Sequence, residues 1–267
     1  MSVSDILNQK PHPDRAIIFA TIDDAEHFSK EDIERIVSSY PEYEREARTR
    51  GIPSLGSGRV FPVDENKIKV DPFPVPRHWA HIIGVDFGWD HPFGAAKIAW
   101  DKDSDVLYVT ACYRERQATP PIHAAAIRPW GDKITVAWPH DGLQHDKSSG
   151  LQLKEQYIKQ GLNMWHEHAT HEAGGFGIEA GILEMLERMQ TGRFKVFSTL
   201  NEWFEEYRLY HRKDGLIVKL ADDILSATRI AVMMRRYALP LGQEPDKRGQ
   251  SDYGSEYGYS DESWKVA

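Results

Sequence analysis

The stretch that decides the fold is His81-Ile82-Ile83-Gly84-Val85-Asp86-Phe87-Gly88. Its apolar run is typical of a buried strand, which we expect to cover Ile82–Asp86 and to end at the Asp86 carboxylate. A second apolar run stops at an acid in the same way, in Ile134-Thr135-Val136-Ala137-Trp138-Pro139-His140-Asp141-Gly142. The pattern therefore predicts two buried strands that each lead to an aspartate.

Further strands and helices follow the first strand in a definite order. We expect strands over Ala95–Trp100 and Val106–Arg114 to form an antiparallel meander with the first one. A helix near 121–130 then leads to the strand over Thr135–Trp138. The later predicted elements are helices over about 150–160, Ile178–Met189, 201–211 and from Asp222 or Asp223 to Tyr237, short strands near Met164 and over Phe194–Phe197, and a hairpin over Arg212–Lys219 that turns at Asp214-Gly215. This order indicates an α/β ribonuclease H-like fold, a mixed sheet flanked by helices.

Composition divides the chain into three segments. We predict that residues 1–77 form a small helical connector, with one helix after Ser29 and one over Pro41–Arg50, followed by a stretch interrupted by glycine and proline. Residues 78–238 should form the main domain. Residues 239–267 lack apolar periodicity and are rich in Gly, Ser, Asp and Glu, which predicts a disordered acidic tail.

The bulk composition is that of a globular protein. The chain has 267 residues, of which 40% are hydrophobic and 11% aromatic. Its single cysteine, Cys112, excludes a disulfide framework and a cysteine-based zinc site. Without a long apolar run or a signal pattern, we expect a soluble, intracellular protein with no membrane partner. The net charge of −8 argues against a sequence-independent DNA-coating protein, but not against an enzyme with an acidic metal site.

A third acidic stretch opens the last predicted helix: Ala221-Asp222-Asp223-Ile224-Leu225-Ser226-Ala227-Thr228-Arg229. Two strand-borne carboxylates and one helix-borne carboxylate, if they meet in space, form a cage of hard oxygen ligands. Such a cage suits Mg²⁺ or Mn²⁺ and, with two ions, the hydrolysis of phosphodiesters. We predict Asp86, Asp141 and Asp223 as the ligands. Asp222 is the alternative to Asp223, and both also suit the cap and first turn of a helix.

Several other short motifs accompany the three acidic stretches. They are Thr21-Ile22-Asp23-Asp24-Ala25-Glu26-His27, Tyr40-Pro41-Glu42, Glu44-Arg45-Glu46-Ala47-Arg48, Arg50-Gly51-Ile52-Pro53, Gly56-Ser57-Gly58-Arg59-Val60-Phe61, Asp86-Phe87-Gly88-Trp89 and Phe204-Glu205-Glu206-Tyr207-Arg208-Leu209-Tyr210-His211. In this order and spacing, over roughly residues 16–237, the motifs resemble the C-terminal nuclease domain of the large terminase subunit of tailed bacteriophages. The likeness is to the headful-packaging branch of these DNA-packaging motors.

The resemblance implies a metal-dependent endonuclease that cuts concatemeric double-stranded DNA during genome packaging. It implies two Mg²⁺ or Mn²⁺ ions held by the three acids, and the host cytoplasm as the location. The implied partners are double-stranded DNA, the terminase ATPase domain, the small terminase subunit and the portal. The phosphate loop that the family's ATPase needs, G-x-x-x-x-G-K-[ST], does not occur in the sequence, so we expect no ATPase domain in this chain.

Two observations keep alternatives open. Many relatives carry an acid at the position of Ser226, four residues after Asp222, and the neutral hydroxyl here is compatible with a non-catalytic DNA-clamping module of the same fold. Gly84-Val85-Asp86-Phe87-Gly88 also resembles the first phosphate loop of actin-like ATPases and sugar kinases. The second glycine-rich loop that such proteins need is not convincing in this sequence.

Cationic residues on the predicted hairpin are candidates for DNA binding. Arg212, Lys213 and Lys219 precede the last helix and are predicted to contact the DNA backbone, with a plain exposed hairpin as the equal alternative. Asp90 and His91, on the loop after the first strand, are predicted either to lie near an ion or phosphate or to form a solvated turn.

The histidines give a weaker signal. The cluster over His166–His171 matches neither H-E-x-x-H nor a cysteine-containing finger, so we predict a polar loop near the active face rather than a zinc site. His140 is predicted to be structural.

Overall fold

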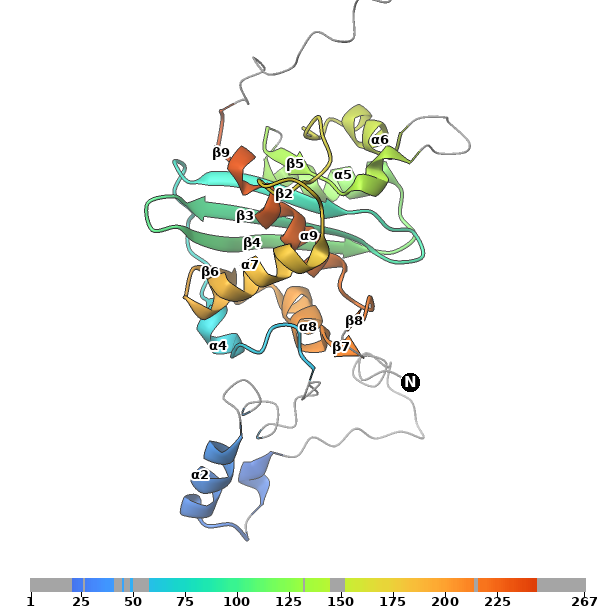
Figure 1. Cartoon of the computed structure of the whole chain (residues 1–267). Coiled ribbons are helices and arrows are strands. Elements are labelled where there is room, and N and C mark those ends of the chain that lie inside the picture. Colours follow the sequence, from blue (N-terminus) through green and yellow to red (C-terminus); the bar gives the residue numbers. More distant parts are fainter. Residues whose placement is uncertain are drawn as a thin grey trace, which may run out of the picture.

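The computed structural model describes residues 21–25, 27–40, 45, 49, 58–131, 133–144, 152–213 and 216–243 (Figure 1). Most of the predicted helix over Pro41–Arg50, the hairpin turn at Asp214-Gly215 and most of the predicted tail lie outside these residues. None of the helices in the described part of the chain combines the length and the apolar character needed to cross a membrane.

The strands and α-helices between Ala80 and Met233 follow the order predicted from the sequence. The strands are β1 (Lys69–Val70), β2 (Ala80–Asp86), β3 (Phe93–Asp101), β4 (Val106–Glu115), β5 (Thr135–Ala137), β6 (Phe194–Phe197), β7 (Arg212–Lys213), β8 (Leu216–Ile217) and β9 (Leu239–Pro240). The α-helices are α2 (Lys30–Ser39), α4 (Glu65–Ile68), α5 (Pro120–Ile127), α6 (Leu153–Lys159), α7 (Ile178–Gln190), α8 (Asn201–Leu209) and α9 (Asp223–Met233). The 3-10 helices are η1 (Ile22–Asp24), η2 (Arg128–Trp130), η3 (His140–Leu143) and η4 (Arg235–Tyr237).

The main sheet is mixed, with the strand order β1-β6-β4-β3-β2-β5, and β9 also pairs with β2. Strands β2, β3 and β4 form the predicted antiparallel meander. Strand β5 lies parallel to β2, and β6 lies parallel to both β4 and β1. The predicted mixed sheet flanked by helices is therefore confirmed.

The sheet has a hydrophobic core on each face, because alternate side chains of a strand point in opposite directions. Ile82 packs with residues of α7, α8 and α9, whereas Ile83 and Val85 pack with α5 and α6. At Gly84 the backbone of α9 lies so close to β2 that a Cβ atom there would overlap the carbonyl oxygen of Ala227. The sequence of β2 thus determines how closely α9 approaches the sheet.

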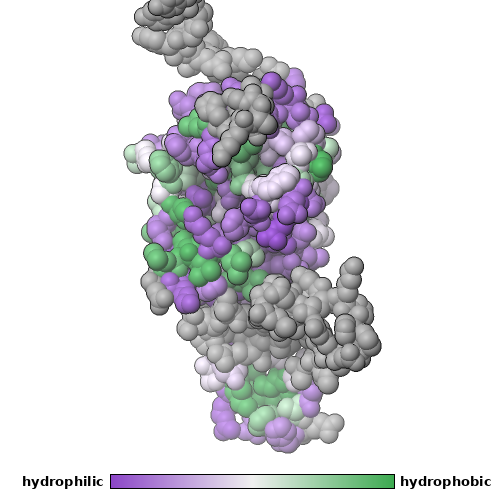
Figure 2. Space-filling view, turned by 90° about the vertical axis from the view of Figure 1, so that its right-hand side faces the viewer, coloured by the Kyte–Doolittle hydropathy of each residue, from purple (hydrophilic) through white to green (hydrophobic). Residues whose placement is uncertain are grey.

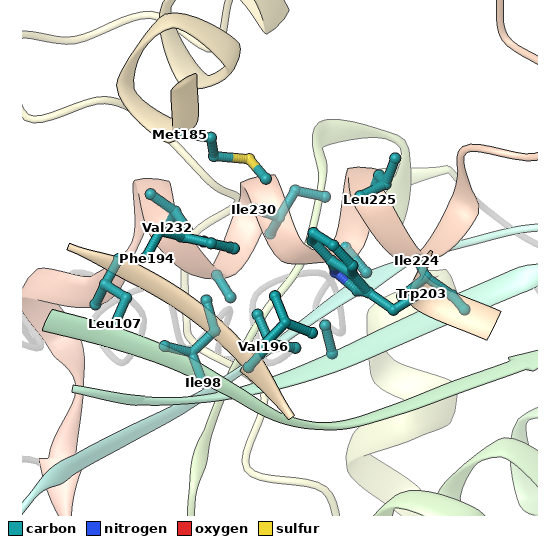
Figure 3. Close-up of a cluster of buried hydrophobic side chains, with 14 of the residues drawn as sticks. Ile98, Leu107, Met185, Phe194, Val196, Trp203, Ile224, Leu225, Ile230 and Val232 are labelled. Atoms are coloured by element: carbon teal, nitrogen blue, oxygen red, sulfur yellow. The ribbon is translucent and has the colours of Figure 1, made fainter. Parts of the chain in front are cut away.

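Helix α9 lies across the sheet, and Figure 3 shows its apolar side chains over those of the strands. Ile224, Ile230 and Val232 are fully or almost fully buried in this cluster, together with Trp203 of α8. The indole Nε1 of Trp203 donates a hydrogen bond to Thr228 Oγ1 at 3.1 Å, so the polar atom of this buried ring is satisfied. This packing makes α9 a rigid support for the acids at its start.

The sheet extends beyond the range 78–238 predicted for the main domain. Before that range, β1 pairs with β6, and Phe61 is buried against the rings of Tyr207 and Tyr210. After it, β9 pairs with the start of β2, so residues 239–240 belong to the sheet and not to a disordered tail. Only two residues form each added strand, which is too short for a sequence pattern to reveal.

Two further predicted elements differ in detail. The expected strand near Met164 is a single bridge to Val136. The expected last helix to Tyr237 ends at Met233 and continues as the 3-10 helix η4. The second difference lies at a helix end, where a few hydrogen bonds decide the assignment.

Candidate metal centre at the end of the sheet

Three chain segments bring the predicted acids to one end of the sheet. Asp86 is the last residue of β2 and pairs with Gly94 of β3. The first turn of α9 lies directly on this pair, because a Cβ at Gly94 would overlap the backbone carbonyl oxygen of Asp223. Asp141 follows β5, the parallel neighbour of β2, and the adjacent Gly142 packs closely against the ring of Phe87. Asp141 and Asp223 therefore both lie beside the end of β2.

The charges of the acids are coupled. Burial is the main cause that raises the pKa of Asp86 to about 7, and the negative charge of Asp141 is the next. Arg229 lowers this pKa, while Asp223 and Asp222 raise it further. Since like charges raise a carboxyl pKa only when they are near, the four acids form one electrostatic group.

The pKa values of the other three acids are raised as well. Burial is again the main cause that raises the pKa of Asp141, Asp222 and Asp223. The positive charge of Lys219 acts against the shift at Asp141 and at Asp222. Asp141 Oδ1 is buried and has no hydrogen-bond partner among the described residues, which is costly unless something else binds this oxygen.

The donor atoms fit a hard divalent cation in type. All four side chains offer carboxylate oxygens, the ligands preferred by Mg²⁺ and Mn²⁺. One of these oxygens is the buried Asp141 Oδ1 described above. The side chains do not form a ready-made cage, however. Within the described residues, no three His, Cys, Asp or Glu side chains are arranged to hold a metal ion. A bound ion would have to draw the carboxylates closer together.

Two charged residues at this site were missed by the sequence analysis. Arg229 of α9 is 8% exposed, and its Nε has no hydrogen-bond partner in the described part of the chain. Its charge lowers the pKa of both Asp86 and Asp222. Arg229 follows Asp222 by seven residues, which is two helical turns, and this spacing was the available signal in the sequence.

Glu206 of α8 is the second missed residue. It is fully buried and accepts hydrogen bonds from the first turn of α9. No local pattern could have linked Glu206 to residues 18 positions later.

A cavity of about 200 Å³ opens beside Asp141. Its lining residues are Pro139, His140, Asp141, Ala169, Phe176, Ile178, Arg229, Ile230 and Met233. The exposed His140 stacks on Phe176, with ring centroids 5.5 Å apart, and His168 packs edge-on against His140. The histidine-rich loop therefore lies next to the candidate centre, as predicted, and His140 contributes to the wall of the cavity.

The predicted DNA-binding cations lie in two different environments. Arg212 forms an ion pair with Glu179 of α7, with Nη1 2.8 Å from Oε1, which ties the β7-β8 hairpin to α7. Lys213 and Lys219 are exposed, and Lys219 is near enough to the acids to act on Asp141 and Asp222. Figure 2 shows the face on the right-hand side of Figure 1, where hydrophilic residues predominate and smaller hydrophobic groups lie between them.

The loop after β2 carries the last pair of candidates. Asp90 and His91 are both exposed. The charge of His91 lowers the pKa of Asp222 and of Asp223, so His91 lies near the start of α9. His91 is thus both exposed to solvent and close to the acids, so the two interpretations of this loop both stay open.

Comparison with protein families gives a clear match. Residues 83–235 match the family described as "Terminase RNaseH-like domain". The chain belongs to this family. The matched range begins inside β2, ends inside η4 and includes all four acids, so the candidate centre lies within the family domain.

Relatives of this RNase H-like terminase domain were found among both sequences and structures. The chain is 48% identical over 242 residues to the large terminase subunit of Salmonella phage P22, and 48% identical over 228 residues to that of Enterobacteria phage LP7. These matches cover 89% and 85% of the chain, and the chain spans about half the length of both relatives, 48% in each case.

Solved structures extend the comparison. The nuclease domain of the P22 large terminase matches with a TM-score of 0.65 and 48% identity, over 70% of this chain and 96% of that domain. The large terminase of a thermophilic bacteriophage matches with a TM-score of 0.52 and 18% identity, over 79% of this chain and 54% of that protein. This second, more distant match shows the fold alone. The ribonuclease H-like fold predicted from the sequence is confirmed by the family match and by the P22 domain.

Proposed function

We propose that this terminase domain is a metal-dependent endonuclease that cuts concatemeric double-stranded DNA during phage genome packaging. The observation that carries the proposal is the electrostatic coupling of Asp86 to Asp141, Asp223 and Asp222 at one end of the sheet. Family membership supports it, together with 48% identity to a solved terminase nuclease domain. The expected setting is the host cytoplasm, with the terminase ATPase domain, the small terminase subunit and the portal as partners.

The residues of the site have distinct roles in this proposal. Asp86, Asp141 and Asp223 would hold two Mg²⁺ or Mn²⁺ ions, and Asp222 remains the alternative to Asp223. When bound, such ions supply an activated water and stabilise the leaving 3′ oxygen. Arg229 offsets part of the negative charge of the acids, which keeps the cluster stable without a bound cation.

A non-catalytic DNA clamp is the second candidate function. Two points favour it: Ser226 is neutral at a position where the resemblance to the family implies an acid, and the described side chains do not form a ready-made metal cage. A clamp would bind DNA through the same cationic hairpin and would not cleave it. Cleavage therefore separates the two candidates.

The decisive experiment is a plasmid-nicking assay with the 267-residue chain. We expect relaxed and linear products with Mn²⁺ or Mg²⁺, and their complete loss when EDTA removes the ions. Re-addition of excess Mn²⁺ should restore cleavage. Folded protein that binds DNA but leaves the plasmid intact under all these conditions would support the clamp instead.

Replacing Lys219 with alanine should weaken DNA binding without preventing folding. The exposed ammonium group of Lys219 lies near the acids, where it would neutralise one phosphate of the bound DNA. The slope of log affinity against log salt should fall by about one, with a loss of several-fold in affinity at low salt. Fluorescence anisotropy with a short duplex would measure both. Lys102→Ala is the matched control, because Lys102 lies in the β3-β4 turn at the opposite end of the sheet.

A further inference from the structure

The first turn of α9 has an unusual cap. Helices commonly begin with a residue whose side chain accepts a hydrogen bond from an amide two or three positions later. Asp222 occupies the cap position, yet its side chain makes no such bond. The amides of Ile224 and Leu225 instead donate to Oε2 of Glu206, at 2.8 Å and 3.0 Å. A residue of α8 has thus taken over the role that Asp222 would ordinarily fill.

Glu206 is itself held from the sheet. Its Oε1 accepts a hydrogen bond from Arg114 Nη1 at 2.9 Å, and the Glu206 side chain is completely buried. Arg114 of β4 pairs with Gly94 of β3, which in turn pairs with Asp86 of β2. Asp86, Gly94 and Arg114 therefore form one row across three strands. Glu206 connects one end of this row to the start of α9, which lies on Gly94.

The hydrogen-bond partners of Glu206 suit the ionised carboxylate, although its burial does not. Burial raises the pKa of Glu206 to about 8, while the hydrogen bond from Leu225 and the charge of Arg114 lower it. All three hydrogen-bond partners are donors, so the ionised form can accept every one of these bonds. A neutral amide in its place would turn an NH₂ group toward at least one donor.

We propose that Glu206 is a positioning residue for the metal centre: it caps α9 in place of Asp222 and so leaves the Asp222 and Asp223 carboxylates available for cations. This inference rests on the proposed function. Without Glu206, the free amides of α9 attract the nearest carboxylate, and Asp222 stands in the cap position from which it can supply one. The acid would then turn toward its own helix and away from Asp86.

The test compares Glu206→Gln with Glu205→Gln in the full chain. The two residues are neighbours on α8, but the Glu205 side chain is 46% exposed and lies 3.8 Å from Arg114. The assays use Mg²⁺ in alkaline buffer, above the pKa of Glu206. We expect E206Q to need about 10- to 100-fold more Mg²⁺ for half-maximal cleavage, as is usual when a group that orients a metal ligand is lost. The KM for DNA should stay near that of the wild type, and E205Q should match the wild type in both respects.

A second readout does not depend on activity. Mg²⁺ raises the melting temperature of a protein that binds it, to an extent set by its affinity for the folded state. The E206Q variant should require roughly ten times more Mg²⁺ than E205Q for the same rise. Equal Mg²⁺ responses of the two variants would overturn the inference. Failure of the wild type itself to cleave DNA would count against the proposed function, and the melting curves would still decide the role of Glu206.

Two further variants make the test robust. If E206Q does not fold, Arg114→Lys keeps the positive charge but loses the forked guanidinium, and it should shift the Mg²⁺ requirement in the same direction by a smaller factor. Asp222→Asn tests directly whether the Asp222 carboxylate turns to the free amides of α9 when Glu206 is lost. It should weaken Mg²⁺ binding less in the E206Q background than in the wild type, because Asp222 has already left the centre. Equal losses in the two backgrounds would contradict that step.

Discussion

Replacing Asp86 with asparagine should abolish DNA cleavage and, at the same time, stabilise the metal-free protein in neutral to alkaline buffer. Asp86 is the acid whose charge is coupled to all three others. Asparagine preserves the shape of the side chain but removes the negative charge that a divalent cation requires. We expect the cleavage rate to fall on the order of a thousandfold or more. Plasmid nicking with Mn²⁺ measures this directly.

The stability change has a definite sign and pH range. The pKa of Asp86 is raised from 3.8 to about 7 in the folded protein, so the folded state holds the proton more tightly than the unfolded chain does. The stability that comes from this proton is fully present below pH 3.8 and is lost as the pH rises through about 7. Asparagine cannot ionise and avoids the loss. Because Asp86 is partly exposed, we expect a gain of about 2 kcal/mol above pH 7, less than the full pKa shift implies.

Melting temperatures across the pH range check this expectation. With EDTA present, the D86N variant should exceed the wild type above pH 7 by an amount that shrinks steadily as the pH falls toward about 4. Asp90→Asn is the control, since Asp90 is exposed on the loop after the same strand. A pH-independent difference between D86N and the wild type would show that burial does not penalise the Asp86 charge. Retained cleavage by D86N would remove Asp86 from the proposed site.

The second large effect concerns Gly84, where the backbones of β2 and α9 meet. A Cβ at this position would overlap the carbonyl oxygen of Ala227 and lie 2.7 Å from the amide nitrogen of Ala231. Neither atom belongs to a flexible side chain, so α9 as a whole would have to move. We expect Gly84→Ala to lower the free energy of unfolding by at least about 3 kcal/mol. It should also lower cleavage in any protein that still folds, because α9 carries Asp223.

Chemical denaturation measures the stability loss, and Gly177→Ala provides the control. A Cβ at Gly177 meets no atom within 4 Å, and this glycine precedes α7 with an ordinary backbone conformation. The control should therefore unfold within about 1 kcal/mol of the wild type. If the two alanine variants are equally stable, the close approach of α9 to β2 is not a tight constraint.

The parts of the fold that were predictable are those with strong local patterns. The apolar run before Asp86 and the turn-separated strands after it identified the meander, and the helical spacing over Ile178–Met189 identified α7 almost to the residue. The position of Asp86 followed from the same logic, because an acid that ends a buried strand must emerge at the end of the sheet. Asp141 was expected to end its strand as well, but β5 stops at Ala137 and Asp141 lies in the 3-10 helix η3 that follows it. Their role as ligands remains a prediction.

What could not be predicted depends on contacts between residues far apart in the chain. β1 and β9 are two residues long and exist only because a neighbouring strand offers hydrogen bonds. Glu206 reaches α9 across a turn and a hairpin, and its neighbour Glu205 has the same chemistry but is exposed. Helical periodicity alone cannot decide which of two adjacent glutamates is buried and which one faces solvent.

The pairing of β9 with β2 has a practical consequence for attaching other molecules. Pro240 lies opposite Ala80 and Leu239 opposite His81, at the start of β2, whereas Asp86 is at its finish. A fluorophore or surface tether placed on the exposed Leu241 would accordingly sit about the length of a strand, roughly 20 Å, from the carboxylates. A duplex could then approach the acids freely, and single-molecule cutting could be watched from an anchor that does not obstruct it.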